Sequence, residues 1–386
     1  VNTLSGCSVA VNYTPPVIID NVTLIGDLVI TVSPDYAVPG YVFPVGVTEV
    51  TYSVVDETGN SLVYTFDVTV IDNINPTLTC AAGSPGNEFH RGTDLNQAYY
   101  TTSGTEFDPT EYFDNCAVTL TNNRNSSESL AGVTFPVGTT TVTWTATDAS
   151  NNVTTCSIQV IVEDDQIPLI TNCPDATVAE IAESGECYYL VPGSEYDPYG
   201  FSDNDDLDRL TYSINGGAEV GIDLNTTLVG LQIPVGTTTI IWRLYDVNGN
   251  VSNTCQTIFT ITDPEPPTVV TVGTQTRSTD TGVSTYTAKT PADDDWNPSV
   301  SDNCEVDIIT YTIDGGTPVG TNELTSIIGE VFAIGTHTVL WTATDIHGNI
   351  STGSYQVIVE DEDDPTAVCN PYTVYLDENG IYMLDS

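Results

Sequence analysis

The stretch FPVGTTTVTWTATDASNN, residues 135–152, decides the fold of this chain. In it, Val142, Trp144 and Ala146 alternate with threonines, which is the period of a β-strand that buries one face. The strand ends on Asp148, followed by an asparagine-rich turn. The same element returns at 43–60, 233–250 and 332–349, as FPVGVTEVTYSVVDETGN, IPVGTTTIIWRLYDVNGN and FAIGTHTVLWTATDIHGN. The chain therefore repeats one structural unit four times.

The spacing of the copies indicates tandem domains. Their anchor glycines, at positions 46, 138, 236 and 335, lie 92, 98 and 99 residues apart, a period too long for a solenoid. After each copy come a turn, a second β-rich run and an acidic linker with proline. Short strands, turns rich in Gly, Asn and Asp, and no helical periodicity predict an all-β fold of tandem immunoglobulin-like β-sandwiches in an extended rod. The predicted domains are 1–71, 72–162, 163–262 and 263–359, with 360–386 opening a fifth, truncated domain.

The first predicted domain is short. Its opening residues SGCSVAVNYTPP, at 5–16, align with SGECYYLVPGSE, at 184–195, which we interpret as a second strand. We therefore expect the first domain to lack its first strand, and the parent protein to be longer than this chain.

Composition narrows the class of protein. The 386 residues carry 53 acidic and 6 basic side chains, a formal charge of −47, so nucleic acid and anionic membranes are not expected partners. No apolar run reaches the ~18 residues that a membrane span needs. Nine cysteines without a CxxC pair favour disulfides in an oxidising, extracellular setting. The three histidines, His90, His337 and His347, form no catalytic pattern and are expected in loops or on exposed strand faces, so we predict that the protein is not an enzyme.

Several of these segments resemble the hyalin repeat (HYR) domain. The resemblance rests on the eighteen-residue element, the tripeptide DNC at 114–116 and 302–304, the dipeptide TC before a final strand, and the openings NPTLTC and IPLITNCP. It covers nearly the whole chain, although the fourth domain lacks both the opening cysteine and TC. The resemblance implies an extracellular array, as in large bacterial surface adhesins of the gliding Bacteroidota type and in animal extracellular proteins.

The positions of the cysteines within the repeat suggest their partners. Opening-strand and last-strand cysteines occur together, which predicts Cys80–Cys156 and Cys173–Cys255 within domains, each worth roughly 2–4 kcal/mol. The remaining cysteines alternate between second strands and DNC loops, which predicts Cys7–Cys116 and Cys187–Cys304 between neighbouring domains. The alternative is that these four are free or partner-bound thiols. Cys369 would pair within the truncated domain.

Acidic and amide side chains should meet where the domains join. In this topology the incoming linker, the loop after the second strand and the turn after the long element share one end of each sandwich. So many oxygens favour Ca²⁺, which takes roughly six to eight of them, with an affinity on the order of 10⁻⁴–10⁻³ M. The alternative is that these residues only cap turns and keep the rod soluble. The predicted ligand sets are Asp72, Asn73, Asn75, Asp114 and Asp148; Glu163, Asp164, Asp165, Asp203, Asn204, Asp246, Asn248 and Asn250; Asp263, Glu265, Asp302 and Asp345; and Glu360, Asp361, Asp363 and Asp364.

The predicted function is structural: a stalk segment of an extracellular cell-surface adhesin or filament, stiffened at its junctions by calcium. One alternative is a carbohydrate-binding module, for which Trp296 in DDDWNP is the candidate exposed aromatic, whereas Trp144, Trp242 and Trp341 are expected in cores. A second alternative is a self-assembling filament in which residues 366–386 complete the first domain of a neighbouring copy. The partners expected are therefore calcium, surface glycans or further copies of the chain.

Overall fold

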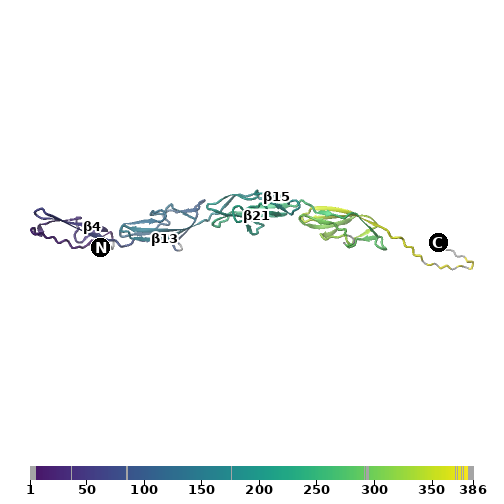
Figure 1. Ribbon diagram of the computed structural model, residues 1–386, viewed down its shortest axis with the longest axis horizontal. Helices are drawn as coiled ribbons and strands as arrows, with labels where there is room; N and C mark the ends of the chain where they lie inside the picture. Colours follow the sequence, from purple (N-terminus) through teal and green to yellow (C-terminus); the bar gives the residue numbers. More distant parts are fainter. Residues whose placement is uncertain are drawn as a thin grey trace.

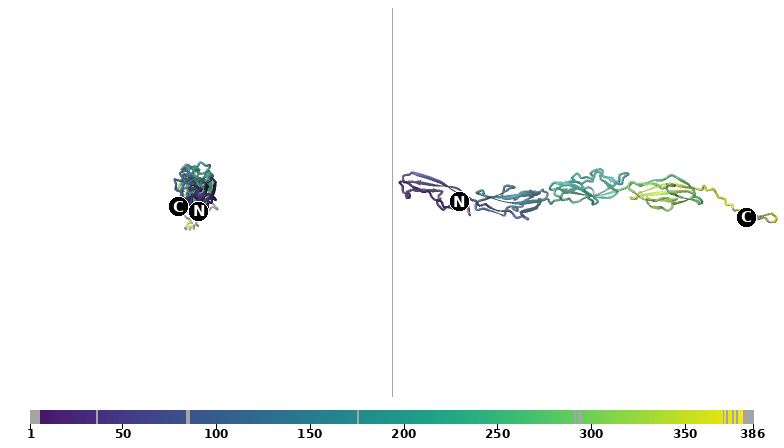
Figure 2. Two further views of the ribbon diagram at one scale, coloured as in Figure 1. Left: turned by 90° about the vertical axis from the view of Figure 1, so that its left-hand side faces the viewer. Right: turned by 60° about the horizontal axis from the view of Figure 1, so that its bottom comes forward.

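The computed structural model describes the chain except residues 1–5, 36, 84–85, 175, 291, 293–294, 370, 372, 375, 377 and 381–386. Four β-sandwiches follow one another along a single axis (Figure 1), and a view along that axis shows how narrow the rod is (Figure 2). Apart from one short 3₁₀ turn, Ile25–Asp27, every regular element of the described residues is a strand. The fold is thus all-β, with immunoglobulin-like sandwiches in tandem. No helix in the described part of the chain has the length and apolarity to cross a membrane.

The second sandwich shows the plan. Its main sheet has the order β10-β12-β13-β7, in which β7 lies parallel to β13 and the other pairs are antiparallel. Two small sheets, β11-β8 and β6-β9, complete it. The strands are β6 (Thr77–Thr79), β7 (Glu88–Gly92), β8 (Tyr99–Thr101), β9 (Glu111–Phe113), β10 (Val118–Asn122), β11 (Thr134–Pro136), β12 (Gly138–Asp148) and β13 (Val153–Glu163).

The third and fourth sandwiches repeat this plan with one more strand at the edge. Their main sheets have the orders β15-β22-β21-β18-β19 and β24-β31-β30-β27-β28. Their small sheets are β14-β17 and β16-β20, then β23-β26 and β25-β29. The third contains β14 (Leu169–Asn172), β15 (Thr177–Ile181), β16 (Tyr188–Leu190), β17 (Tyr199–Ser202), β18 (Leu207–Ile214), β19 (Glu219–Val220), β20 (Gln232–Pro234), β21 (Gly236–Asp246) and β22 (Cys255–Thr262). The fourth contains β23 (Thr268–Val270), β24 (Gln275–Ser278), β25 (Thr285–Thr287), β26 (Ser299–Ser301), β27 (Val306–Ile313), β28 (Val319–Asn322), β29 (Val331–Ala333), β30 (Gly335–Asp345) and β31 (Ile350–Glu360).

The first sandwich is smaller. It has a main sheet β2-β4-β5 and a pair β1-β3, built from β1 (Ser8–Val11), β2 (Val29–Ser33), β3 (Tyr41–Pro44), β4 (Gly46–Val55) and β5 (Ser61–Val70). β1 pairs with β3 as β16 pairs with β20, so it occupies a second-strand position. Within the described residues, no strand lies along the outer edge of β5, where β7 borders β13 in the second sandwich.

The repeated eighteen-residue element forms a corner and the central strand of each main sheet. Val142, Trp144 and Ala146 on β12 are fully buried, whereas the threonines between them are not. The indole of Trp144 donates a hydrogen bond to the carbonyl of Phe107 at 3.2 Å. Gly138, at φ 105°, takes the corner between β11 and β12 in a conformation that side chains with a Cβ rarely adopt. Trp242 and Trp341 repeat the buried position of Trp144, and Tyr52 replaces them in the first sandwich.

Trp296 also belongs to a core, which corrects its assignment as an exposed aromatic. Only 1 % of its surface is exposed. Its ring lies 5.7 Å from that of Tyr286 and 6.0 Å, edge to face, from that of Phe332. The acidic residues around it in the sequence suggested a surface loop, but the side chain turns inward. Trp296 therefore offers no platform on which a sugar could stack.

Candidate functional site

Each junction between neighbouring sandwiches gathers three aspartates from three different elements. One comes from the incoming linker, one from the loop before the main sheet, and one from the end of the long strand. At the second and third junctions the three carboxylates lie within 4.8 Å of one another. At the first junction Asp72 and Asp114 come this close together with Cys116, which is bonded to Cys7. There the Asn152 amide links Asp148 to the Asp72 carbonyl. The sets of three are Asp72, Asp114 and Asp148; Asp164, Asp203 and Asp246; and Asp263, Asp302 and Asp345.

The strand-end aspartate is held by its own turn. In the third sandwich Oδ1 of Asp246 accepts hydrogen bonds from the backbone N–H groups of Asn248 and Asn250, at 2.9 and 2.8 Å. Its Oδ2 accepts one from the side-chain amide of Asn250 at 2.8 Å. Asp148 and Asp345 make the same turn with Asn152 and Asn349. The turn fixes a carboxylate that is itself almost fully buried at the junction.

Asparagine side chains at the second junction present nitrogen rather than oxygen to the carboxylates. The Asn204 amide donates to Oδ1 of Asp164 at 2.9 Å, and the Asn248 amide donates to its Oδ2 at 3.3 Å. Asn250 reaches across the junction to donate to the backbone carbonyl of Asp164 at 3.0 Å. Amide oxygens were predicted as cation ligands; in the structure the amide nitrogens of Asn204 and Asn248 donate to the Asp164 carboxylate.

The loop aspartates keep one oxygen without a partner. Oδ1 of Asp114, Asp203 and Asp302 is buried in each case and accepts no hydrogen bond. Asp114 is only 6 % exposed. A buried carboxylate oxygen without a hydrogen bond or a counter-charge is costly. The same unpartnered oxygen thus recurs at the same place in three junctions.

The pKa values of two of these groups agree with their surroundings. Burial, followed by repulsion from Asp164 and Asp246, raises the pKa of Asp203 above its ordinary value. For Asp345, burial alone would raise the pKa, but hydrogen bonds from Asn349 and the turn outweigh it and lower the pKa. The strand-end aspartate is thus satisfied within its sandwich, whereas the loop aspartate lacks a positive partner.

The other predicted ligands lie outside these clusters. Asn73, Asn75 and Asp165 are exposed. Glu163 is exposed as well and lies 3.3 Å from the imidazole of His90. Glu265 crosses the third junction instead, accepting hydrogen bonds from the Ser184 hydroxyl at 2.8 Å and the Gly185 N–H at 2.9 Å. The exposed C-terminal linker holds the remaining four, Glu360, Asp361, Asp363 and Asp364.

His347 also belongs to the third junction, although its repeat position suggested an ordinary surface turn. Its Nδ1 lies 3.4 Å from Oδ2 of Asp263. His347 stands two positions after the strand-end aspartate of its turn. The other three turns have Thr58, Ser150 and Asn248 at that position.

The first sandwich has a further pair of aspartates, one in a loop and one at a strand end, that was not predicted from the sequence. Asp20 and Asp56 lie at the end of the first sandwich that is remote from the second, in the positions that Asp114 and Asp148 hold in the second. Asp20 accepts hydrogen bonds from the N–H groups of Val22 and Thr23, and Asp56 from Asn60. The hydrogen bond from the Asn60 side chain is the main reason that the pKa of Asp56 lies below its ordinary value. The signal in the sequence is the dipeptide Asp20-Asn21, which repeats Asp114-Asn115, Asp203-Asn204 and Asp302-Asn303.

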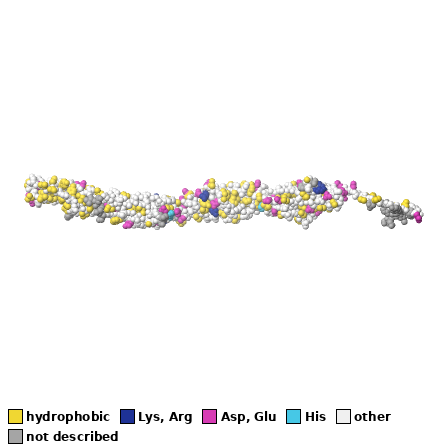
Figure 3. Space-filling view, turned by 90° about the horizontal axis from the view of Figure 1, so that it is seen from below, with side chains coloured by type: hydrophobic (Ala, Val, Ile, Leu, Met, Phe, Trp, Pro, Cys, Tyr) yellow, Lys and Arg dark blue, Asp and Glu magenta, His cyan; other side chains and the backbone are white. Residues whose placement is uncertain are grey.

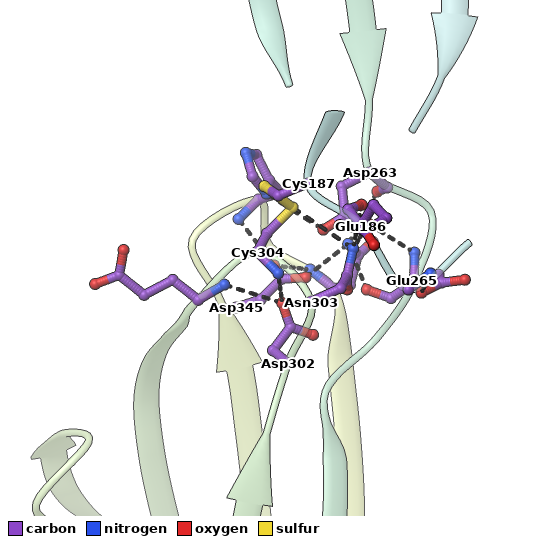
Figure 4. Close-up of polar contacts among 12 residues, drawn as sticks. Glu186, Cys187, Asp263, Glu265, Asp302, Asn303, Cys304 and Asp345 are labelled. Atoms are coloured by element: carbon purple, nitrogen blue, oxygen red, sulfur yellow. Dashed lines mark hydrogen bonds and ion pairs between the residues drawn. A yellow bond between two sulfur atoms is a disulfide. The ribbon is translucent and has the colours of Figure 1, made fainter. Parts of the chain in front are cut away.

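Two junctions also carry a disulfide. Cys7 is joined to Cys116 and Cys187 to Cys304, with Cα–Cα distances of 4.9 and 4.7 Å. These are the same pairs that the sequence analysis placed between domains, and Figure 4 shows the second of them beside the carboxylate cluster. The other two disulfides, Cys80–Cys156 and Cys173–Cys255, close loops within the second and third sandwiches.

The second junction has hydrogen bonds in place of a disulfide. The Gln166 side chain donates to the Thr93 hydroxyl at 2.7 Å and the carbonyl of Asp94 at 3.0 Å. Its oxygen accepts from the Asn96 N–H at 2.8 Å. The Asn204 amide donates to the Gln97 carbonyl at 3.1 Å. This junction is therefore ordered but not covalently closed.

The chain is similar to several known proteins. Residues 3–70 and 72–162 each match the HYR domain. Hyalin from Strongylocentrotus purpuratus is 30% identical over 375 residues, which cover 94% of this chain and 27% of that protein. Hyalin from Lytechinus variegatus is 28% identical over 377 residues, covering 95% of this chain and 61% of that protein. The chain thus spans less than two thirds of either relative. Among solved structures, immunoglobulin domains 1–5 of Sidekick-1 match 93% of this chain and 78% of that one, with 10% identity and a TM-score of 0.33.

Proposed function

Residues 3–70 and 72–162 match the HYR domain, and from this we propose that the chain is an array of such domains, the stalk of an extracellular adhesion protein whose junctions are stiffened by calcium. The relatives are hyalins, which supports the adhesion-type class, and the rod shape supports a spacer role. Each main strand of about 11 residues at ~3.3 Å per residue adds roughly 36 Å to the rod. The function proposed is therefore to hold a binding region at a distance, with no catalysis.

The observation that carries the calcium part is the repeated buried carboxylate cluster. Asp164 comes from the linker, and Asp203 and Asp246 come from a loop and a strand end of the third sandwich; Oδ1 of Asp203 has no hydrogen-bond partner. Hard oxygen ligands without sulfur or imidazole at the second junction suit Ca²⁺. When bound there, calcium would neutralise carboxylates that otherwise repel one another. Because the linker and the two loops supply the ligands together, binding would fix the angle between the sandwiches.

Calorimetric titration and thermal melts of the full chain test this proposal. At about 10 mM Ca²⁺ and a dissociation constant of ~10⁻⁴–10⁻³ M, mass action predicts about 1.4–2.7 kcal/mol of stabilisation, a rise in Tm of several degrees. Mg²⁺ is the matched control, because it demands a smaller octahedral site and should give a smaller shift. Absence of both binding heat and a Tm shift with Ca²⁺ would refute calcium stiffening while leaving the stalk function intact.

The sequence left two alternative functions open, carbohydrate binding and self-assembly through a strand. Carbohydrate binding loses its candidate residue, since Trp296 is buried. The resemblance to bacterial adhesins remains a proposal about the parent protein. The two relatives reported above are hyalins from Strongylocentrotus purpuratus and Lytechinus variegatus, and neither is a bacterial adhesin.

A further inference from the structure

The third junction has an imidazole where the second has an amide. The residue two positions after the strand-end aspartate faces the linker aspartate at both junctions. At the second it is Asn248, whose amide donates to Oδ2 of Asp164 at 3.3 Å. At the third it is His347, whose Nδ1 lies 3.4 Å from Oδ2 of Asp263. An amide nitrogen can only donate, whereas a neutral imidazole nitrogen has a lone pair that binds metals. The third junction therefore has a nitrogen ligand that the second lacks.

A cysteine sulfur lies beside this pair. The ligand atoms of Asp263, Cys304 and His347 all lie within 4.8 Å of one another, and Figure 4 shows Cys304 next to Asp263. Cys304 is bonded to Cys187, and a disulfide sulfur is not a ligand for zinc. Once released from that bond, Cys304 could form a thiolate, the state in which cysteine binds metals.

The loops that carry these side chains are held by hydrogen bonds as well as by the disulfide. The N–H of His347 donates to Oδ1 of Asp345 at 2.8 Å, within the turn that ends the long strand. The N–H of Cys304 donates to Oδ2 of Asp302 at 2.9 Å. The three candidate ligands should therefore stay close together when the disulfide is opened.

Asp263 has one oxygen that no hydrogen bond uses. Its Oδ1 accepts from the Glu265 N–H at 3.1 Å and from the Asn303 amide at 3.2 Å. Its Oδ2 is buried and accepts no hydrogen bond. On the face drawn in Figure 3, the described Lys and Arg side chains gather within the third sandwich and at the far end of the fourth, away from this junction. Oδ2 is thus open to a metal ion, and the His347 side chain, 25% exposed, gives the ion access from solvent.

We propose that the third junction contains a zinc site that the Cys187–Cys304 disulfide blocks and that reduction makes available. A small dithiol would break the sulfur–sulfur bond, form its own disulfide and leave two protonated cysteines. Cys304 would then lose its proton to solvent as its sulfur binds Zn²⁺, together with Nδ1 of His347 and Oδ2 of Asp263. Three protein ligands and a water complete a tetrahedral zinc site.

The geometry and the ligand types suit zinc. Two ligands roughly 2.0–2.3 Å from one tetrahedral ion lie about 3.3–3.7 Å apart. The 3.4 Å between His347 and Asp263 already has this value, so only the freed Cys304 side chain has to turn. Thiolate and imidazole favour zinc, whereas calcium prefers oxygen ligands alone.

This inference goes beyond the calcium-stiffened stalk and does not require calcium to bind. Asp263 also lies within 4.8 Å of Asp302 and Asp345, so zinc would draw one carboxylate away from the cluster proposed for calcium. Titrating zinc in calcium-free buffer therefore tests the two proposals separately.

The variant Cys187→Ser opens the site without a reductant, because it frees Cys304 and leaves the other three disulfides intact. The matched variant Cys7→Ser frees Cys116 at the first junction. Cys116 also lies among carboxylates, but Ser150 holds the place of the histidine there. The two variants thus compare a freed cysteine with and without an imidazole beside it.

Cobalt titration in calcium-free buffer provides the measurement, since Co²⁺ substitutes for zinc and a bond between sulfur and cobalt absorbs in the near ultraviolet. Cys187→Ser should show this band and, by competition, bind Zn²⁺ at least about tenfold more tightly than Cys7→Ser. Adding His347→Asn to Cys187→Ser should remove that advantage. Cys369 is free in every variant and cannot cause a difference. Equal affinities of the two single variants, or no effect of His347→Asn, would overturn the proposal.

A second comparison keeps all the cysteines. Wild type that has been reduced with a dithiol, and then freed of it without air, should bind zinc at least about tenfold more tightly than His347→Asn treated in the same way. Oxidised wild type should show no sulfur–cobalt band. Equal zinc affinity of the two reduced proteins would contradict a site built on His347.

Discussion

Cys187 in the third sandwich is bonded to Cys304 in the fourth, 117 positions away. Beside it, the side-chain amide of Asn303 donates to the Glu186 carbonyl at 3.1 Å and to Oδ1 of Asp263 at 3.2 Å. The disulfide and the carboxylate cluster thus occupy one junction. The first junction repeats this arrangement with Cys7 and Cys116, whereas the second has its cluster but no disulfide. Covalent and non-covalent junctions therefore alternate along the rod.

This alternation predicts where the rod should bend. Chelating calcium should broaden the distance distribution between labels that flank the second junction, because only hydrogen bonds then remain there. The first and third junctions should broaden only when a reductant is added as well. Pulsed electron spin resonance on labels flanking each junction provides the measurement. Equal broadening at all three junctions without a reductant would contradict a mechanical role for the disulfides.

Asp203→Asn should have opposite effects with and without calcium. Its pKa is raised in the folded state, so the ionised carboxyl destabilises the calcium-free protein at neutral pH, and that cost disappears as the pH falls through the folded pKa. In chelator the variant should therefore melt higher than wild type at pH 7, with a smaller advantage at lower pH. In calcium it should melt lower, because a ligand is lost. Thermal melts of both proteins in both buffers measure this.

Asp307→Asn is the control for that comparison, since Asp307 is exposed on β27 and away from the cluster. It should melt like wild type in both buffers. If Asp203→Asn also melts like wild type in both, Asp203 is not a ligand.

His337 should make the fourth sandwich pH-dependent. Its Nδ1 lies 2.7 Å from Oδ2 of Asp314, and this hydrogen bond is the main cause that raises the pKa of His337 and lowers that of Asp314. Because the histidine pKa is raised on folding, the stabilisation is complete below its unfolded value of ~6.5 and is lost as the pH rises through the folded value. His337→Gln should therefore lower Tm more at pH 5.5 than at pH 8.5. His90→Gln, at a side chain that is 47% exposed, should show a smaller difference between the two pH values.

Trp296→Ala should destabilise the fourth sandwich by about 3–5 kcal/mol, the usual cost of removing a large buried aromatic. Urea unfolding followed by fluorescence would show it as a lower midpoint for one transition. Tyr199→Ala removes an aromatic that is 67% exposed and should cost less than about 1 kcal/mol. Similar midpoints for the two variants would mean that Trp296 does not pack in the core.

Much of the fold was predictable from the sequence because it depends on local patterns. The alternation of Val142, Trp144 and Ala146 requires one buried face, and the repeat places three more such strands in the same sandwich position. The repeat period also placed the strand-end aspartates at the ends of the sandwiches. Since repeated residues occupy repeated environments, pairing cysteines by their position in the repeat led to the disulfides that the structure contains.

The features that the sequence did not predict depend on whether a side chain is buried and which atom it presents, and composition does not determine either. Asn73 and Asn75 stand in the linker beside Asp72, yet both are exposed and only the aspartate is buried. The amide of Asn250 turns its nitrogen to Asp164, because a carboxylate and a carbonyl nearby need donors. Trp296 stands among acids in the sequence and is buried all the same.

The alternation of disulfides also constrains how the repeat can change in number. Losing the second sandwich alone would leave Cys7 facing Asp205, and losing the third alone would leave Cys304 facing Ala98. Losing both together would bring Cys7 opposite Cys304, with every junction thiol still partnered. Shortening or lengthening of the array is therefore least disruptive in steps of two sandwiches.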